Sequence, residues 1–389
     1  MVFRMSARDA LGAIDADPSR EGCVARQHAL RAALLERGLK AALIVQPSHI
    51  TYLFGLYGWR AIPAAAVVGV DGDAVLAIGA SCPAEPETAK LVRYEDCRFT
   101  TLRDEREALA VAAVVECLPS AGRIGVDSHG QPFALRAREV APIGDALTTL
   151  RRRKHPDEIA RIERAVSATE AGYEAAAAII RPGLIETDLF AAFLAAATRA
   201  AGEPIGELGS DFRGGAPGGR SRQMPLAEGD LLPLDAGAVV GGYTADLCRT
   251  FAVSGEFTPA QRDAFSAVRD ALIFAKTIIR PGVSCRAVFR TLHQRLDGYR
   301  GWRFDHHLGH GIGLCAHEAP RLNPHWDDVF QEGDVFTLEP GLYGDDLRAG
   351  VRLEEDYALT SDGLRQLSSY PLDPQSAFGS PAARMNGQH

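Results

Sequence analysis

The sequence has little lysine: only four of its 42 basic residues are lysines, and arginine supplies the rest. Aspartate and glutamate together number 50, so the 389-residue chain carries a formal charge of −8. Proteins that bind nucleic acid or a membrane surface need a concentrated basic face to neutralise phosphates. The densest basic run, residues 151–154, is too short to provide one. We therefore expect no nucleic-acid partner and no membrane partner.

Long apolar runs and paired cysteines are also missing. No segment approaches the roughly 18 consecutive apolar residues of a membrane-spanning helix, and the first residues lack the apolar core of a signal peptide. The seven cysteines are scattered and never spaced Cys-x-x-Cys, which argues against a disulfide framework and a thiolate zinc site. We expect a soluble cytoplasmic protein whose cysteines are Cys23, Cys82, Cys97, Cys117, Cys248, Cys285 and Cys315 in reduced form.

Two common catalytic signatures are absent as well. The chain has no Gly-x-Ser-x-Gly elbow, which argues against an α/β-hydrolase serine nucleophile. None of the four lysines follows a glycine, so no P-loop exists. A Gly-x-Gly-x-Gly run at residues 309–313 lacks the later spacing of a dinucleotide fingerprint.

The chain divides into parts of different texture. Apolar β-type runs at 41–45, 64–70, 74–78 and 123–126 alternate with helical stretches at 23–37 and 105–118, which predicts an α/β domain. A basic run and a long helical segment follow near residue 150. We expect an N-terminal domain over residues 1–148, a second domain over 149–372, and a disordered tail over 373–389.

The second domain repeats itself. Ile-Ile-Arg-Pro-Gly occurs at 179–183 and again at 278–282, and a Gly-Asp strand pattern occurs at 229–237 and again at 333–341. The offsets are 99 and 104 residues. Two pairs in the same order predict an internal duplication. The duplication places Asp235 and Glu339 at equivalent points of the two halves, where they could surround a pair of metal ions.

Residues 230–253 are predicted to form a hairpin whose turn is Gly241-Gly242. In that register Val240 faces Tyr243, Asp235 faces Cys248, and Asp246 is the diagonal neighbour of Asp235 on the same face. Diagonal neighbours lie roughly 7–8 Å apart, close enough for two carboxylates to share cations. Either aspartate alone would be read as a turn or surface acid, as most aspartates are.

In the second half, Glu339 lies at the end of a predicted strand that stops at Pro340-Gly341, and the segment at 350–356 begins another strand. Period-two alternation lets only one of Glu354 and Glu355 face the site, and Glu354 shares the face of Arg352. Arg352 is expected to orient ligands or carboxylates, or else to be a solvated strand arginine.

Between the halves, residues 306–317 hold four of the chain's eleven histidines. This density favours a functional site over isolated core or surface histidines. If the segment is a strand, His306 and His310 share a face while His307 points away.

Taken together, these residues resemble the superfamily of Xaa-Pro aminopeptidase, prolidase, methionine aminopeptidase and creatinase, the M24-type metallopeptidases with the pita-bread fold. The resemblance covers nearly the whole chain, because residues 47–55 are similar to a signature of the creatinase-like N-terminal domain. It implies an α/β N-terminal domain and an α+β catalytic domain with pseudo-two-fold duplication. It also implies a homodimer.

The resemblance implies a metal centre with two divalent ions per subunit. Mn²⁺ is expected first, with Fe²⁺, Co²⁺ or Zn²⁺ as alternatives, because the set is rich in carboxylates. Catalytic roles fall on His306, His317 and Glu339, with Arg352 near the substrate. The implied metal ligands are Asp235, Asp246, His310, Glu339 and Glu354.

The sequence departs from this family in one place. Peptidases of the superfamily carry another histidine roughly a dozen residues before the Gly-Asp strand, but no histidine occurs here between His155 and His293. A glycine-rich loop with Arg213, Arg220 and Arg222 takes its place. These arginines could hold an anionic substrate group, or the loop could be an ordinary surface loop.

Three functions remain open from the sequence. The first is a dinuclear-metal hydrolase of short peptides, similar to Xaa-Pro dipeptidase or aminopeptidase P. The second is a non-peptidase relative acting on a small molecule, in the manner of ectoine hydrolase, creatinase or dimethylsulfoniopropionate (DMSP) lyase. The third is a binding protein that keeps the fold without turnover.

Overall fold

A computed structural model describes residues 19–57, 63–96, 105–128, 135, 138–209 and 211–374. The described residues divide into two compact units, one up to residue 151 and one from residue 152 onward. Most of the expected tail, from residue 375 onward, lies outside the described residues, and the expected boundary after residue 148 stays a prediction. No helix of the described segments has the length and apolar character needed to cross a membrane.

The first unit is an α/β domain, as the alternating pattern predicts. Its six-stranded mixed sheet has the order β4-β3-β2-β1-β5-β6, and α4 packs against β2 and β3. Pro47 begins α3, and Gly55, with a φ of 73°, ends it in the left-handed region that glycine adopts readily. Its elements are α2 (Arg20–Glu36), β1 (Ala41–Ile44), α3 (Pro47–Phe54), β2 (Ala65–Gly69), β3 (Val75–Gly79), β4 (Lys90–Tyr94), α4 (Arg106–Val115), β5 (Ile124–Val126), β6 (Val140–Pro142) and α5 (Gly144–Arg152).

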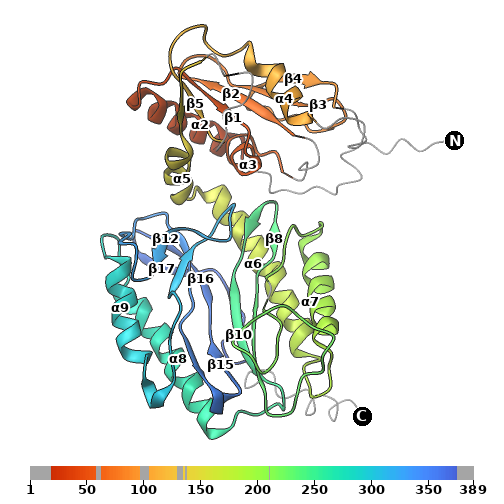
Figure 1. Ribbon diagram of the computed structural model, residues 1–389, viewed down its shortest axis with the longest axis vertical. Helices are drawn as coiled ribbons and strands as arrows, with labels where there is room; N and C mark the ends of the chain where they lie inside the picture. The colour runs from red at the N-terminus through yellow and green to blue at the C-terminus, as the bar shows by residue number, and fades with distance from the viewer. Residues whose placement is uncertain are drawn as a thin grey trace, which may run out of the picture. The chain divides into compact units, whose positions relative to one another are not determined.

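The second unit has four long helices beside short antiparallel strands (Figure 1). A five-stranded sheet has the order β12-β11-β13-β16-β17, while β7 pairs with β10, β14 with β15 and β8 with β9. The helices are α6 (Pro156–Ala177), α7 (Glu186–Ala201), α8 (Pro259–Ile278) and α9 (Cys285–Leu296). The strands are β7 (Leu231–Ala236), β8 (Val239–Val240), β9 (Tyr243–Thr244), β10 (Leu247–Ala252), β11 (Gly309–Gly311), β12 (Glu318–Leu322), β13 (Val335–Leu338), β14 (Gly341–Gly344), β15 (Ala349–Arg352), β16 (Glu355–Thr360) and β17 (Gly363–Gln366).

The predicted duplication is visible in equivalent backbone contacts. Gly183 follows α6 and donates to the Leu226 carbonyl at 2.9 Å, and Gly282 follows α8 and donates to the Phe330 carbonyl at 2.8 Å. Both glycines have positive φ, 84° and 89°, which explains why glycine occurs in both copies of the Pro-Gly motif.

Each half also has its own hydrophobic core. One cluster joins α6 and α7 to β7 and β10, with Tyr173 and Phe193 in edge-to-face contact at 5.1 Å. The other joins α8 and α9 to β13 and β16, and in it the ring centroids of Phe336 and Phe330 lie 5.0 Å apart. The fold class predicted from the sequence is confirmed. The strands that carry the acidic residues lie between these two helix pairs (Figure 1).

Candidate metal centre

The predicted hairpin is confirmed in its register. Val240 pairs with Tyr243 and Asp235 pairs with Cys248, so the turn lies at the two glycines. Gly241 and Gly242 both have positive φ, 56° and 88°, as this tight two-residue turn requires. Asp235 is the last residue but one of β7 and Asp246 directly precedes β10, and both carboxylates line one cavity.

The two halves meet through backbone hydrogen bonds between Cys248 and Glu354. The amide of Glu354 donates to the Cys248 carbonyl at 3.0 Å, and the Cys248 amide donates back at 3.4 Å. This bridge brings Glu354 beside the hairpin. Glu355 points the other way and pairs with Arg249 at 2.7 Å. The prediction that only Glu354 faces the site therefore holds.

The histidine segment differs from the expected strand. Only residues 309–311 form β11, and residues 305–308 bend before it. Gly309 has a φ of 153°, and a Cβ there would lie 2.1 Å from the Thr337 carbonyl oxygen. Because the alternation breaks at this glycine, His307 turns toward the site: its Nδ1 lies 3.2 Å from Oε1 of Glu339. The expectation that His307 points away is wrong.

Acidic and imidazole groups converge at three overlapping points. Within each group the nearest ligand atoms all lie within 4.8 Å of one another. All five residues implied as metal ligands occur in these groups, although their ligand role stays a prediction. The groups are His307 with His310 and Glu339, Asp246 with His310 and Glu354, and Asp235 with Glu339 and Glu354.

The electrostatics of this cluster are unfavourable for carboxylates alone. Burial raises the pKa of Asp246 well above its usual value, and repulsion from Asp235 adds to the effect. The pKa of Glu354 rises for the same reasons, burial first and then Asp246. Burial, and then Asp235, likewise raise the pKa of Glu339. Two buried glutamates and two half-buried aspartates that repel one another are stable when cations offset their charge.

The donor set fits divalent cations. Oε1 of Glu339 and Oε2 of Glu354 are buried and have no hydrogen-bond partner among the described residues. Burial and the neighbouring His317 lower the pKa of His310 to about 3, so its imidazole is neutral and able to bind a cation. Four carboxylates and an imidazole suit Mn²⁺, Fe²⁺, Co²⁺ or Zn²⁺. The residues present therefore fit the dinuclear centre implied by the sequence.

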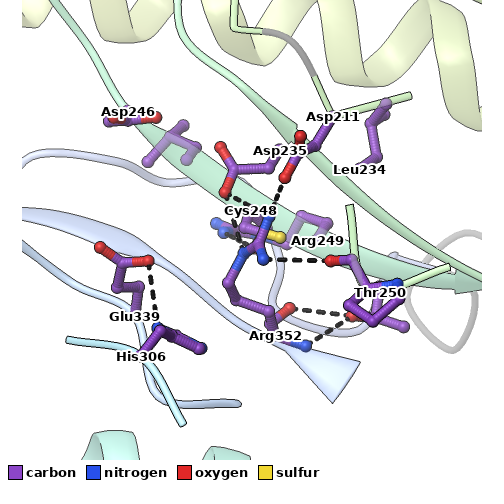
Figure 2. A network of polar contacts seen from close by, with 12 residues as sticks. Asp211, Leu234, Asp235, Asp246, Cys248, Arg249, Thr250, His306, Glu339 and Arg352 are labelled. Atoms are coloured by element: carbon purple, nitrogen blue, oxygen red, sulfur yellow. Dashed lines mark hydrogen bonds and ion pairs between the residues drawn. The ribbon is translucent and has the colours of Figure 1, made fainter. Parts of the chain in front are cut away.

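Arg352 connects two of the aspartates (Figure 2). Its Nη2 lies 2.6 Å from Oδ2 of Asp211 and 2.8 Å from Oδ2 of Asp235. The side chain is only 10% exposed, which excludes the alternative of a solvated strand arginine. Arg352 instead fixes the orientation of Asp235 at the edge of the cluster.

Tyr343 and His306 extend this network. Nδ1 of His306 lies 2.7 Å from the His307 carbonyl oxygen, which can only accept, so Nδ1 carries the proton. Nε2 then accepts from the Tyr343 hydroxyl at 2.9 Å, and that hydroxyl accepts from Nη1 of Arg352 at 3.2 Å. The network therefore sets both the tautomer and the orientation of His306.

The cluster opens into a cavity of about 400 Å³ whose lining includes Asp235, Asp246, Glu339 and Glu354. His306 and His317, both expected near the substrate, also line it. The His317 ring lies 4.1 Å from the His310 ring, centroid to centroid. A neighbouring cavity of about 500 Å³ shares these histidines and continues toward Phe304 and Trp326.

The glycine-rich loop lines the cavity with residues other than its three arginines. Arg213, Arg220 and Arg222 are absent from the described residues that line the cavity. Nη2 of Arg222 pairs with Glu186 at 2.6 Å, so its charge already has a partner within the fold. The loop reaches the cavity instead through Gly209, Asp211 and Pro217. A substrate role for Arg213, Arg220 and Arg222 stays a prediction.

Three functional candidates escape a reading of the sequence. Asp211 lies in an irregular loop without any periodic signal, and Tyr343 is an ordinary strand tyrosine until its partners are known. Asp356 could have been found, because period two places it on the face of Glu354. Its buried Oδ2 accepts from the amide of Asp246 at 3.0 Å, which holds that segment in place.

Two family models match the chain. Residues 160–361 match metallopeptidase family M24, and residues 26–151 match the creatinase/prolidase N-terminal domain. Solved structures share the fold: prolidase from Pyrococcus furiosus has a TM-score of 0.72 at 24% identity, covering 88% of this chain and 99% of that one. A variant of Escherichia coli aminopeptidase P has a TM-score of 0.73 at 22% identity, covering 95% and 99%.

Curated relatives agree with the family models. Xaa-Pro dipeptidase of Pyrococcus furiosus is 31% identical over 59% of this chain and 67% of its own length. The uncharacterized peptidase YqhT of Bacillus subtilis is 26% identical over 86% and 95%. The putative dipeptidase YkvY of Bacillus subtilis is 31% identical over 59% of this chain and 64% of its own length. The chain therefore belongs to metallopeptidase family M24, a family of metal-dependent hydrolases, and carries a creatinase/prolidase N-terminal domain.

Proposed function

We propose that the protein hydrolyses short peptides with proline in the second position, as an Xaa-Pro dipeptidase or an aminopeptidase P-like enzyme. The observation that carries the proposal is the convergence of Asp235, Asp246, His310, Glu339 and Glu354 on overlapping points in one cavity. Relatives named Xaa-Pro dipeptidase support the substrate class.

The proposed centre holds two divalent ions, with Mn²⁺ first and Fe²⁺, Co²⁺ or Zn²⁺ as alternatives. Asp246 and Glu354 would contact both ions, Asp235 one of them, and His310 with Glu339 the other. Such a pair activates a water molecule and polarises the scissile carbonyl. The remaining steps belong to side chains of this chain.

Glu339 is placed to move the proton. A carboxyl group has two oxygens, so the oxygen of Glu339 that does not hold the ion could accept a proton from the attacking water and return it to the leaving nitrogen. His317 would hold the substrate carbonyl oxygen. The ring of His306, held by Tyr343 and the His307 carbonyl, would form part of the wall of the same cavity. Arg352 keeps Asp235 in position throughout.

A second function is favoured by the loop that crosses the cavity. The expected peptidase histidine is missing from the sequence, and Asp211 and Pro217 occupy the cavity wall in this part of the chain. A carboxylate and a proline change the shape and charge that a substrate meets. This observation favours hydrolysis of a small non-peptide amide in the manner of ectoine hydrolase or creatinase, or lysis in the manner of DMSP lyase.

The test separates these proposals on the purified protein. Reconstitution with Mn²⁺ followed by incubation with a panel of Xaa-Pro dipeptides and longer Xaa-Pro peptides should release the first residue only when metal is present. Matched dipeptides with alanine in the second position serve as controls. Metal binding without cleavage of any member refutes the peptidase proposal and leaves the small-molecule enzyme or a non-catalytic binding protein. Failure to bind a divalent ion refutes both enzymes.

Two further proposals concern the setting of this activity. We infer a homodimer from the family resemblance, and a cytoplasmic location from the scattered spacing of the cysteines, which never form a Cys-x-x-Cys pair. Sedimentation analysis of the intact chain tests the first, because a monomer across micromolar concentrations contradicts it.

A further inference from the structure

We propose that His307 is a sixth ligand of the metal centre, beside the five residues that the family resemblance implies. The inference rests on the proposed dinuclear site and deepens it. It assigns a role to a histidine that the sequence pattern directs away from the site.

The distances support this role. Nδ1 of His307 lies 3.2 Å from Oε1 of Glu339, closer than Nε2 of His310, which lies 3.6 Å from the same oxygen. That oxygen is buried and accepts no hydrogen bond within the described structure. Ligand bonds of about 2.0–2.2 Å bring donor atoms on one ion to roughly this separation. The three groups therefore need little movement to share a cation.

The backbone fixes His307 in this place. The next residue, Leu308, donates to the Leu322 carbonyl at 2.8 Å and accepts from the Glu339 amide at 2.9 Å. The second bond joins the segment directly to the strand end that carries Glu339. The carbonyl of His307 itself accepts from His306. The hydrogen bonds of His306 and Leu308 therefore hold the backbone of His307 beside Glu339.

The consequence is a pair of unequal metal positions. One point combines two imidazoles, His307 and His310, with Glu339, while another is formed by the carboxylates of Asp235, Glu339 and Glu354. Imidazole favours Zn²⁺, Co²⁺ and Fe²⁺, whereas carboxylates suit Mn²⁺. The imidazole-rich position is expected to prefer Co²⁺ and Zn²⁺ over Mn²⁺ more strongly than a position with one histidine would.

The first experiment compares Co²⁺ binding by the full-length wild type, His307→Ala and His325→Ala. His325 is an exposed histidine of the neighbouring cavity and serves as the control. Calorimetry gives the affinities, and the visible absorption of bound Co²⁺ reports its ligands. His307→Ala should weaken one binding step by at least about tenfold and change the spectrum, and Zn²⁺ affinity should fall more than Mn²⁺ affinity. His325→Ala should match the wild type.

The second experiment needs no variant and remains decisive if His307→Ala does not fold. Wild-type protein labelled with ¹⁵N in histidine is loaded with an NMR-active cadmium isotope, and the histidine rings coupled to the metal are counted. Two coupled rings support the proposal, whereas one ring overturns it. Unchanged affinity and spectrum in a folded His307→Ala overturn it as well. If the wild type binds no divalent ion at all, the proposed function is refuted, whereas a wild type that binds metal through one histidine refutes only the role of His307.

Discussion

Arg352 and Asp235 are joined by two contacts from one guanidinium: Nε donates to Oδ2 at 2.9 Å, and Nη2 lies 2.8 Å from the same oxygen. This leaves Oδ1 of Asp235 for other partners. A buried arginine that fixes a carboxylate from one side determines which oxygen can bind a cation. The strand that carries Arg352 in the second half thus positions an aspartate of the first half.

Replacement of Arg352 with lysine should weaken metal binding although the positive charge remains. Lysine is a single flexible ammonium and cannot contact Asp235 and Asp211 with the planar fork of arginine. We expect the affinity for the first divalent ion to fall roughly 10–100-fold, measured by calorimetry on metal-free protein. Arg348→Lys is the control, because Arg348 is half-exposed and pairs with Asp230. Equal affinities in the two variants would contradict the positioning role.

Glu354→Gln should have opposite effects on stability with and without metal. Burial and repulsion from Asp246 disfavour the charged form of Glu354 in the metal-free protein, so removing the charge should stabilise that form by on the order of 1 kcal/mol. The wild type should gain about 2.7 kcal/mol at a metal concentration 100 times its Kd, a rise in Tm of roughly 5–10 °C. The variant should lose most of this gain.

Differential scanning calorimetry in chelator and in Mn²⁺ measures both effects. Glu228→Gln, at an exposed position, should behave as the wild type in both buffers. A metal-free Glu354→Gln that is less stable than the metal-free wild type would show that repulsion does not dominate at this position.

The hairpin shows which parts of the site the sequence predicts well. Its register follows from the two-residue glycine turn, and the turn fixes Asp235 opposite Cys248 without any distant contact. The duplication likewise predicts the equivalence of Asp235 and Glu339. The positions of the acidic residues can therefore be predicted from local signals, namely a strict turn length and an internal repeat.

The missed parts depend on distant contacts or broken periods. Asp211 meets Arg352 across 141 residues of sequence, and nothing local in its loop predicts that pairing. His307 lies on the face opposite to the one that strict alternation predicts, because the bend ahead of β11 and the positive φ of Gly309 interrupt the alternation. The Arg222–Glu186 pair, 36 residues apart in sequence, likewise has no local signal.

Gly237→Ala should disrupt the geometry of the aspartate pair. A Cβ at this position would lie 1.6 Å from the Ala245 carbonyl oxygen and 3.0 Å from the Cα of Asp246. The two hairpin arms must separate to accept it, which should cost about 3 kcal/mol in unfolding free energy and weaken metal binding. Gly144→Ala is the control, since no atom lies within 4 Å of its added Cβ. Unfolding free energies from urea titration and Mn²⁺ affinities that are the same for the two variants would refute this explanation.

Arg249→Met should destabilise the protein through a buried charge left without its partner. Arg249 is fully buried, pairs with Glu355 at 2.7 Å and donates to the Glu354 carbonyl at 2.7 Å. Removing one member of a buried pair costs about 3–5 kcal/mol, so urea unfolding of the metal-free protein should shift by that amount. Arg269→Met, which removes an exposed arginine paired with Asp270, should change stability by less than about 1 kcal/mol.

A double variant then separates the charge from the packing. Arg249→Met with Glu355→Leu removes both charges, and it should recover a large part of the stability lost in Arg249→Met because no unpaired carboxylate remains. Arg249→Met should also lower the metal affinity, because the Glu354 carbonyl loses the hydrogen bond from Arg249, and the double variant should not regain that affinity. Recovery of both properties together would mean that Arg249 affects the metal centre only through Glu355. If neither stability nor metal affinity recovers, the main contribution of Arg249 to stability is instead the pair of hydrogen bonds that it donates to the carbonyls of Tyr370 and Pro371.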